Sequence, residues 1–262
     1  MRLRKKTKIL FRRMLIITGI AAALLILYIA SGRYAFDTGK NNIPPSINSF
    51  GIRIPKGYTI HGIDVSRHQG KIDWKRVSEV ESNGIRINFA YIKATEGISR
   101  QDENFRQNWE MASQYGLFRG AYHFYYPSRN AKMQAANYLK MVHLESGDLP
   151  PVIDIEYSNG KSAKEICAGL HIFIQILEKK YKTKPIIYTN INFFNRFLKD
   201  EFSSYPIWIS CYFDHYRFFR EFFTPWVIWQ HSESGKVDGI NGYVDLNVLS
   251  GDIKQLQSIC VP

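Results

Sequence analysis

The sequence predicts an α/β fold in which eight strands form a TIM-like barrel, preceded by an N-terminal transmembrane helix. Three observations lead to this prediction. Short apolar runs alternate with helical stretches over most of the chain, which is typical of a sheet with crossover helices. Eight such runs fall within roughly 200 residues, at the small end of the range for this barrel. One uncharged apolar run near the N-terminus is nearly long enough to span a bilayer.

The strand candidates are apolar runs rich in β-branched and aromatic residues. They span residues 60–66, 87–94, 118–126, 151–156, 185–190, 206–212, 226–231 and 243–249. Helical stretches fill the gaps between the first six strands at residues 74–82, 103–115, 131–145, 163–181 and 193–197. Beyond the sixth strand the gaps shorten and no long amphipathic helix is visible. We therefore expect a parallel sheet whose last three strands are joined by loops, the arrangement (β/α)5(β)3.

The N-terminus carries a membrane-targeting pattern. Residues 1–13 hold seven Lys and Arg residues and no acid, and an uncharged apolar run follows at residues 14–30. Positive charge before such a run predicts a cytoplasmic N-terminus and an exported remainder, in a single-pass cell-membrane protein. A signal sequence cleaved near residues 30–32, giving a secreted protein, is the alternative. Without these seven charges the formal net charge of +12 falls to +5, so the basic balance does not indicate a nucleic-acid-binding protein.

The predicted domains follow from this pattern. Residues 1–30 form a basic tip and membrane anchor (or signal sequence), residues 31–58 a linker rich in Gly and Pro, and residues 59–262 the barrel. The three cysteines, Cys167, Cys211 and Cys260, fit no metal spacing. Buried apolar positions are expected for Cys167 and Cys211. One disulfide stays open as an alternative in an exported protein.

The fourth strand candidate places two acids in an apolar run, with Asp154 and Glu156 two residues apart. Positions i and i+2 of a strand point to the same face, so the two carboxyl groups are expected side by side. Close carboxyl groups in a low-dielectric cleft cannot both ionise easily, and one should hold its proton at neutral pH. Such a pair is the minimum requirement for glycoside hydrolysis. By itself the pattern also fits acids that cap a helix or meet a basic partner.

The other strand ends add polar residues to the same rim of the barrel, where TIM-barrel chemistry gathers. In chain order they are Asp64 and Ser66, Lys93 and Glu96, His123 and Tyr126, Asp154 and Glu156, Tyr188 and Asn190, Gln230 and His231, and Asp245 and Asn247. This convergence of polar and aromatic residues indicates a carbohydrate cleft.

The order of these motifs resembles glycoside hydrolase family 25, the Chalaropsis-type lysozymes. The matching segments are His61-Gly62-Ile63-Asp64-Val65-Ser66-Arg67-His68-Gln69-Gly70 with Ile72-Asp73-Trp74, Phe89-Ala90-Tyr91-Ile92-Lys93-Ala94-Thr95-Glu96-Gly97, Gly120-Ala121-Tyr122-His123-Phe124-Tyr125, the Asp154-Ile155-Glu156 strand, Ile187-Tyr188-Thr189-Asn190, and Trp229-Gln230-His231 with residues 239–248. Together they cover nearly all of residues 59–249. The resemblance implies a flattened barrel with five helices.

The resemblance also implies an activity and the residues that carry it. The reaction is cleavage of the β-1,4 bond between N-acetylmuramic acid and N-acetylglucosamine in peptidoglycan, without a metal or cofactor. Glu156 corresponds to the general acid, Asp154 to its partner, and Asp64 and Asp245 to the remaining acidic positions. A same-strand pair is wide for a direct carboxylate nucleophile, which favours attack by the substrate's own acetamido oxygen, with Asp154 orienting the amide.

Further residues are candidates for substrate binding. Rings that could stack on sugars, or else fill the barrel core, are those of Tyr91, Tyr122, Tyr126, Tyr188 and Trp229. Gln230 completes the Trp229 motif. Lys93 needs an acidic partner, either a carboxylate of the cleft or the lactyl or peptide part of the substrate. The basic aromatic segment 217–223 is a possible cleft wall, membrane-facing patch or part of the core.

Two other functions stay open at this point. A non-catalytic peptidoglycan-binding barrel would be expected to lack one of the acids, yet all four are present. A chitinase-like glycosidase also uses acids on the fourth strand of a barrel. No wall-binding repeat is visible after residue 249, so localisation is expected to depend on the N-terminal anchor. The expected partners are peptidoglycan glycan strands and the membrane.

Overall fold

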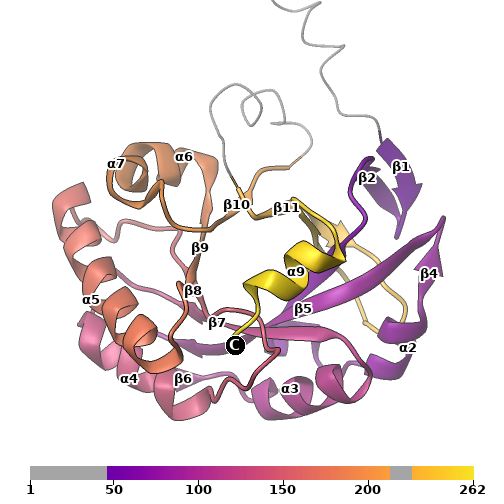
Figure 1. Cartoon of the computed structure of the whole chain (residues 1–262), viewed down its shortest axis with the longest axis horizontal. Coiled ribbons are helices and arrows are strands. Elements are labelled where there is room, and N and C mark those ends of the chain that lie inside the picture. The colour runs from indigo at the N-terminus through magenta and orange to yellow at the C-terminus, as the bar shows by residue number, and fades with distance from the viewer. Residues whose placement is uncertain (1–45, 213–225) are drawn as a thin grey trace, which may run out of the picture. The chain divides into compact units, whose positions relative to one another are not determined.

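The computed structural model describes residues 46–212 and 226–262 (Figure 1). The predicted cytoplasmic tip and membrane anchor at residues 1–30 and the basic aromatic segment 217–223 lie outside the described residues. Within the described ranges, none of the helices combines the length and the hydropathy that a membrane span requires.

Eight strands close into a barrel, as predicted (Figure 1). They are β3 (His61–Val65), β5 (Ile85–Glu96), β7 (Phe118–Phe124), β8 (Val152–Asp154), β9 (Ile186–Asn190), β10 (Ile207–Ser210), β11 (Ile228–Gly235) and β12 (Val244–Leu249). Their order around the barrel is β3-β12-β11-β10-β9-β8-β7-β5, and pairing of β5 with β3 closes the ring. Closure leaves no unpaired edge among these eight strands.

The expectation of an all-parallel sheet is wrong for one strand. β12 runs antiparallel to both of its neighbours, β11 and β3. The loop between β11 and β12, residues 236–243, is too short for the crossover that a parallel connection needs, so the chain returns as a hairpin. The reversal has a consequence for the site: the first residues of β12 lie at the same rim as the last residues of β3, and Asp245 pairs with Asp64.

Helices cover the outside of the barrel in its first half. They are α2 (Trp74–Glu79), α3 (Phe105–Gln114), α4 (Ala131–Met141) and α5 (Ala163–Tyr181), each close to its predicted range. Side-chain caps start three of them, from Asp73, Asn130 and Ser162. The fifth helical region is broken into α6 (Ile191–Phe193), a π-helical turn (Phe194–Leu198) and α7 (Lys199–Phe202).

A short helix at the C-terminus was not predicted. α9 (Ile253–Ile259) starts at the Asp252 cap and buries only Leu256, so its seven residues give little periodic signal. Leu256 joins the apolar cluster that includes Ile60, Ile186 and Leu249. α9 therefore covers the apolar end of the barrel, opposite the rim with the polar strand ends.

The predicted linker at residues 31–58 is wrong from residue 46 onward. β1 (Ser46–Ser49) and β2 (Ile52–Pro55) form an antiparallel hairpin that belongs to the same compact unit as the barrel. Phe50 and Ile54 are buried in the core, and the Lys236 backbone N–H donates to the Phe50 carbonyl at 2.8 Å. Gly51, one of the residues that indicated a flexible tether, instead lies in the tight turn between the two strands, with φ +75°.

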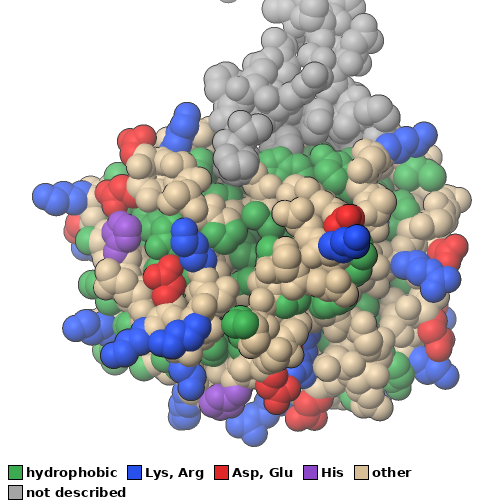
Figure 2. All heavy atoms as spheres, viewed as in Figure 1, with side chains coloured by type: hydrophobic (Ala, Val, Ile, Leu, Met, Phe, Trp, Pro, Cys, Tyr) green, Lys and Arg blue, Asp and Glu red, His purple; other side chains and the backbone are tan. Residues whose placement is uncertain are grey.

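Charged residues of both signs are interspersed over the face of the molecule shown in Figure 2. Two further short strands extend the sheet at β5. The strand β4 (Glu81–Ser82) pairs with the start of β5, and β6 (Arg100–Gln101) pairs with its end.

Candidate active site

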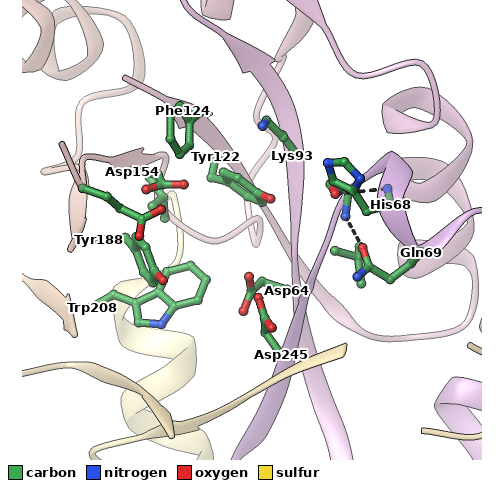
Figure 3. A pocket seen from close by; sticks show the side chains of 14 residues that line it. Asp64, His68, Gln69, Lys93, Tyr122, Phe124, Asp154, Tyr188, Trp208 and Asp245 are labelled. Atoms are coloured by element: carbon green, nitrogen blue, oxygen red, sulfur yellow. Dashed lines mark hydrogen bonds between the residues drawn. The ribbon is translucent and has the colours of Figure 1, made fainter. Parts of the chain in front are cut away.

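The rim predicted from the strand ends holds a cleft of about 240 Å³ (Figure 3). All four acids predicted as catalytic line it: Asp64, Asp154, Glu156 and Asp245. The other lining residues are Val65, Ser66, His68, Gln69, Lys93, Tyr122, Phe124, Val152, Tyr188 and Trp208. The site therefore draws on β3, β5, β7, β8, β9, β10 and β12.

Strand alternation explains how these residues meet. Inward-facing side chains recur at every second position, so apolar layers deep in the barrel are followed by polar ones at the rim. On β8 the inward residues are Val152 and then Asp154; on β9 they are Ile186 and then Tyr188. Each strand thus contributes to the apolar barrel interior before it contributes to the cleft.

The pair at the end of β8 consists of Asp154, the last residue of the strand, and Glu156, two residues beyond it; the two lie side by side as predicted and interact through their carboxyl groups. Burial raises the pKa of Asp154 well above its usual value, and the charge of Glu156 raises it further. Burial also raises the pKa of Glu156. The pair therefore keeps a proton to a higher pH than isolated carboxyl groups would. Among the described residues, Asp154 Oδ1 has no hydrogen-bond partner.

The pair on β3 and β12 consists of Asp64 and Asp245, and amide groups hold it. Asn247 Nδ2 donates to Asp64 Oδ2 at 2.8 Å, and Gln230 Nε2 donates to the same oxygen at 3.1 Å. Gln230 Nε2 also lies 3.3 Å from Asp245 Oδ2. Burial and the charge of Asp64 raise the pKa of Asp245 to about 9, so this pair carries a proton at neutral pH.

Lys93 does have an acidic partner, as predicted, but the partner is Glu96. Lys93 Nζ donates to Glu96 Oε2 at 2.8 Å and lies 4.9 Å from the centre of the Phe124 ring. The other Glu96 oxygen accepts from Tyr126 Oη at 2.9 Å and from Arg100 Nη1 at 3.2 Å. Burial opposes ionisation of Glu96, yet these donors lower its pKa, so it remains a carboxylate.

Two of the five candidate stacking rings line the cleft, namely Tyr122 and Tyr188. Tyr91 does not: it is fully buried one layer deeper, packs on Trp208 and donates to the Pro150 carbonyl at 3.2 Å. Tyr126 lies beyond the end of β7, where its hydroxyl is bonded to Glu96. The structure thus places Tyr91 in the core and Tyr126 against Glu96.

The prediction that Trp229 and Gln230 both contact substrate is wrong, because the two side chains point to opposite sides of β11 and both are buried. Adjacent residues of a strand face opposite sides. Trp229 points out of the barrel, is fully buried and donates to the Cys211 carbonyl at 2.7 Å. Gln230 points in but is only 1% exposed, because it lies behind Asp64 and Asp245 and accepts from Tyr188 Oη at 2.9 Å.

Sequence reasoning missed several lining residues. Trp208 forms part of the cleft and is held by a 2.9 Å hydrogen bond from Nε1 to Asn247 Oδ1; its alternation with Ile207 and Ile209 was a readable signal. Ser66 and Gln69 form a capping box around a short 3-10 turn (Arg67–Gln69), which brings His68 to the rim. A Ser-x-x-Gln spacing directly after a strand indicates such a turn.

A second cavity, of about 470 Å³, lies on the other side of Glu156. Its lining residues are Glu156, Asn190, Ile191, Asn192, Ser210, Cys211 and Tyr212. Among the described residues, Glu156 alone lines both this cavity and the acidic cleft. A ligand that occupied both would cross the Glu156 side chain.

Comparison with known proteins gives a consistent match. The model of the family described as Glycosyl hydrolases family 25 matches residues 63–240. The Escherichia coli O6:H1 protein YegX, described as uncharacterized, is 46% identical over 80% of this chain and 77% of its own length. Lysozyme M1 of Streptomyces globisporus is 32% identical over 76% and 71%. A solved family 25 glycosyl hydrolase from Bacillus anthracis superposes with a TM-score of 0.67 and 30% identity over 78% of this chain and 94% of that one.

Proposed function

The chain belongs to glycosyl hydrolase family 25, and on that premise we propose that it is an N-acetylmuramidase that cleaves peptidoglycan between N-acetylmuramic acid and N-acetylglucosamine. The family and its lysozyme members support a glycoside hydrolase that acts on peptidoglycan. The particular bond, the roles of the four acids and the location of the protein are parts of the proposal.

The observation that carries the proposal is the position of Glu156 between two cavities. An acid that protonates a glycosidic oxygen must stand between the sugar that is attacked and the sugar that leaves. Glu156 meets this condition, whereas Asp154, Asp64 and Asp245 line only the acidic cleft. The attacked muramic acid residue would occupy the acidic cleft, and the leaving glucosamine residue the second cavity.

Asp154 supports the substrate-assisted route. Asp154 lines the acidic cleft, and its carboxyl group can accept a hydrogen bond from the acetamido N–H of the sugar there. A donor on Asp154 favours the ionised form of that carboxyl group, so the shared proton moves to Glu156. The acetamido oxygen then attacks C1, the C1–O4 bond breaks, and O4 takes the proton of Glu156. Glu156, now a carboxylate, removes a proton from the water that attacks C1 and opens the cyclic intermediate.

Asp64 and Asp245 have a different part in this proposal. Both lie in the acidic cleft, and amide donors fix their positions. Their shared negative charge favours the positive charge that develops at C1 in the oxocarbenium-like transition state. They stabilise charge and do not exchange protons with the substrate.

The test compares the full chain with Glu156→Gln on purified peptidoglycan. Loss of the general acid should lower kcat by about 10²–10⁴-fold and leave the fold intact. Glu110→Gln, an exposed position on α3, is the matched control and should keep full activity. Reducing ends identified by mass spectrometry should be N-acetylmuramic acid.

Other outcomes would contradict the proposal in distinct ways. Full activity of Glu156→Gln would remove Glu156 from the mechanism. Binding of peptidoglycan without release of reducing ends would indicate a non-catalytic barrel. Faster cleavage of chitin oligosaccharides than of peptidoglycan would indicate a chitinase-like enzyme.

We further propose that residues 14–30 anchor the protein in the cell membrane, with the barrel on the outer side. Support comes from the seven positive charges before this uncharged run. An anchored protein should stay in the membrane fraction after alkaline extraction and keep the intact mass of the full chain. A soluble product that starts near residues 30–32 would show instead that the run is a cleaved signal sequence.

A further inference from the structure

Lys93 is the one Lys or Arg among the described residues that line the acidic cleft, and two arginines lie with it in a recess beside the cleft. We call this group the cationic corner and define it by Arg67, Lys93 and Arg100. Lys93 lines the acidic cleft, and all three residues line a small adjoining recess of about 10 Å³ (Figure 3 shows Lys93 beside Phe124, away from Asp64 and Asp245). The corner is built from the end of β5, the turn after β3 and the short strand β6.

Lys93 is held rigidly at this corner. Its side chain is 16% exposed, and its ion pair with Glu96 measures 2.8 Å. Glu96 is fixed in turn, because its other oxygen accepts from Tyr126 and Arg100. A lysine side chain normally loses much conformational freedom when it binds a ligand. Here the Lys93 side chain is already ordered by its contacts in the folded protein, so little further conformational entropy is lost on binding and the ammonium group is preorganised at the cleft wall.

The acids at this corner, Glu96 and Asp102, offset only part of the positive charge of its three cations. Glu96 alone serves both Lys93 and Arg100. Asp102 accepts from the backbone N–H groups of Arg67 and Asn104, and so bonds to no side chain of the corner. Among the residues that the structure describes, the Arg67 guanidinium forms no ion pair. By formal charge, the three cations of the corner therefore exceed its two acids, Glu96 and Asp102, by one, and Lys93 lies at the cleft wall.

We propose that the cationic corner binds a carboxylate carried by the lactyl arm of the N-acetylmuramic acid residue. This inference rests on the proposed function. The carboxylate has two possible sources, the lactyl group itself in peptide-free glycan or an acidic residue of the attached peptide stem. Charge-assisted hydrogen bonds from ammonium and guanidinium groups are the strong, specific contacts that such an anion requires.

The proposal fixes the orientation of the bound sugar. The arm on C3 of the muramic acid residue would point toward β5, with its acetamido group toward Asp154 on β8. Chitin has no such arm, so the corner would favour peptidoglycan over chitin. A rival role for Lys93 is to adjust the proton of the Asp154–Glu156 pair, since its charge favours the ionised form of both acids.

The experiment measures kcat and KM of the full chain on three substrates. They are peptide-free glycan strands with free lactyl carboxylates, the same strands with those carboxylates converted to methyl amides, and intact peptidoglycan. The variants are Lys93→Met and Arg67→Gln. In Lys93→Met, Glu96 keeps its bonds to Arg100 and Tyr126. Arg67→Gln alters an exposed side chain, so it should fold even if Lys93→Met does not.

The matched control is Arg86→Gln. Arg86 lies on the same strand, β5, at its other end, where it pairs with Glu81 of β4. The Arg86→Gln variant removes one positive charge from β5 at the end of the strand away from the cleft. Its kcat and KM should therefore equal those of the unaltered chain on all three substrates.

The expected result is a rise in KM of about 10-fold for carboxylate-bearing strands in Lys93→Met, with little change in kcat and no change on amidated strands. An effect on intact peptidoglycan alone assigns the contact to the peptide stem and still supports the corner. Equal losses on all substrates, or a shifted pH profile with unchanged KM ratios, would overturn the inference in favour of proton adjustment. An unaltered chain that cleaves none of the substrates would refute the proposed function itself.

Discussion

Two carboxyl pairs face each other across the mouth of the barrel, and the protein holds them in opposite ways. Asp154 and Glu156 lie at and just beyond the end of β8, whereas Asp64 and Asp245 come from β3 and β12, on the other side of the ring. Asp64 accepts two amide hydrogen bonds, from Asn247 and Gln230. Asp154 has an oxygen with no partner among the described residues.

This difference separates two uses of the same chemical group. A carboxylate that already accepts fixed donors has a set charge and position, and rearranging it would break buried hydrogen bonds. A carboxyl group that lines the cleft and is held by no amide donor can bind substrate and pass a proton on. We therefore assign proton transfer to the β8 pair and fixed negative charge to the β3–β12 pair.

The largest expected effect that tests this assignment compares Asp154→Asn with Asp64→Asn. Asp154→Asn should lower kcat by about 100-fold or more, because the acetamido group loses the carboxylate that orients it. Its melting temperature should stay close to that of the unaltered chain, since no hydrogen bond of Asp154 to an amide is lost. The measurements are kcat on peptidoglycan and thermal unfolding.

Asp64→Asn should show the reverse balance. The new amide would place N–H groups against those of Asn247 and Gln230, or leave one of these donors unpaired, at a cost of about 1–3 kcal/mol in the free energy of unfolding. Its kcat should fall by less than that of Asp154→Asn. If Asp154→Asn proved the less stable of the two and Asp64→Asn the less active, the two roles would have to be exchanged.

A smaller expected effect concerns how the Asp64–Asp245 pair changes the stability of the protein with pH. The pKa of Asp245 is raised to about 9, whereas an aspartate in the unfolded chain has a pKa of about 3.9. The folded state therefore binds this proton more tightly, and the stability it contributes is complete below pH 4. That contribution is lost as pH rises toward 9, at no more than about 1.4 kcal/mol per pH unit.

Asp245→Asn is the variant that checks this dependence. An amide has the shape of the protonated acid but does not titrate, so the decline in melting temperature between pH 5 and pH 9 should become shallower. The raised pKa values of Asp154 and Glu156 leave a remaining slope of the same sign. An unaltered slope in Asp245→Asn would mean that Asp245 is already ionised at neutral pH.

The same contrast explains what the sequence could predict about the site. The acids were identified because a charged residue at a strand end in an apolar run is conspicuous, and period-two alternation correctly set Asp154 and Glu156 on one face. The layer at which a ring lies was not identifiable. Tyr91 and Tyr122 both face the barrel interior, yet only Tyr122 reaches the cleft, because depth depends on strand register and tilt.

The fold also has parts that the sequence could predict and parts that it could not. Eight strands and the long helices were predicted from periodicity, which local sequence determines. The direction of β12, the β1–β2 hairpin and α9 depend on tertiary contacts that short segments do not reveal. Asp245 was nevertheless placed at the right rim; in an all-parallel barrel, a residue at the start of the last strand would lie at the opposite end.

The smallest expected effect concerns Tyr91, the ring that the structure places below the cleft. Tyr91→Phe removes the hydroxyl that donates to the Pro150 carbonyl, at a cost of about 1 kcal/mol in the free energy of unfolding. For a domain of this size, the melting temperature should fall by about 2–4 °C. KM and kcat should not change, because the ring fills the same space against Trp208 and Phe89. A rise in KM without loss of stability would return Tyr91 to the substrate-binding residues and show that sugar reaches one layer deeper into the barrel.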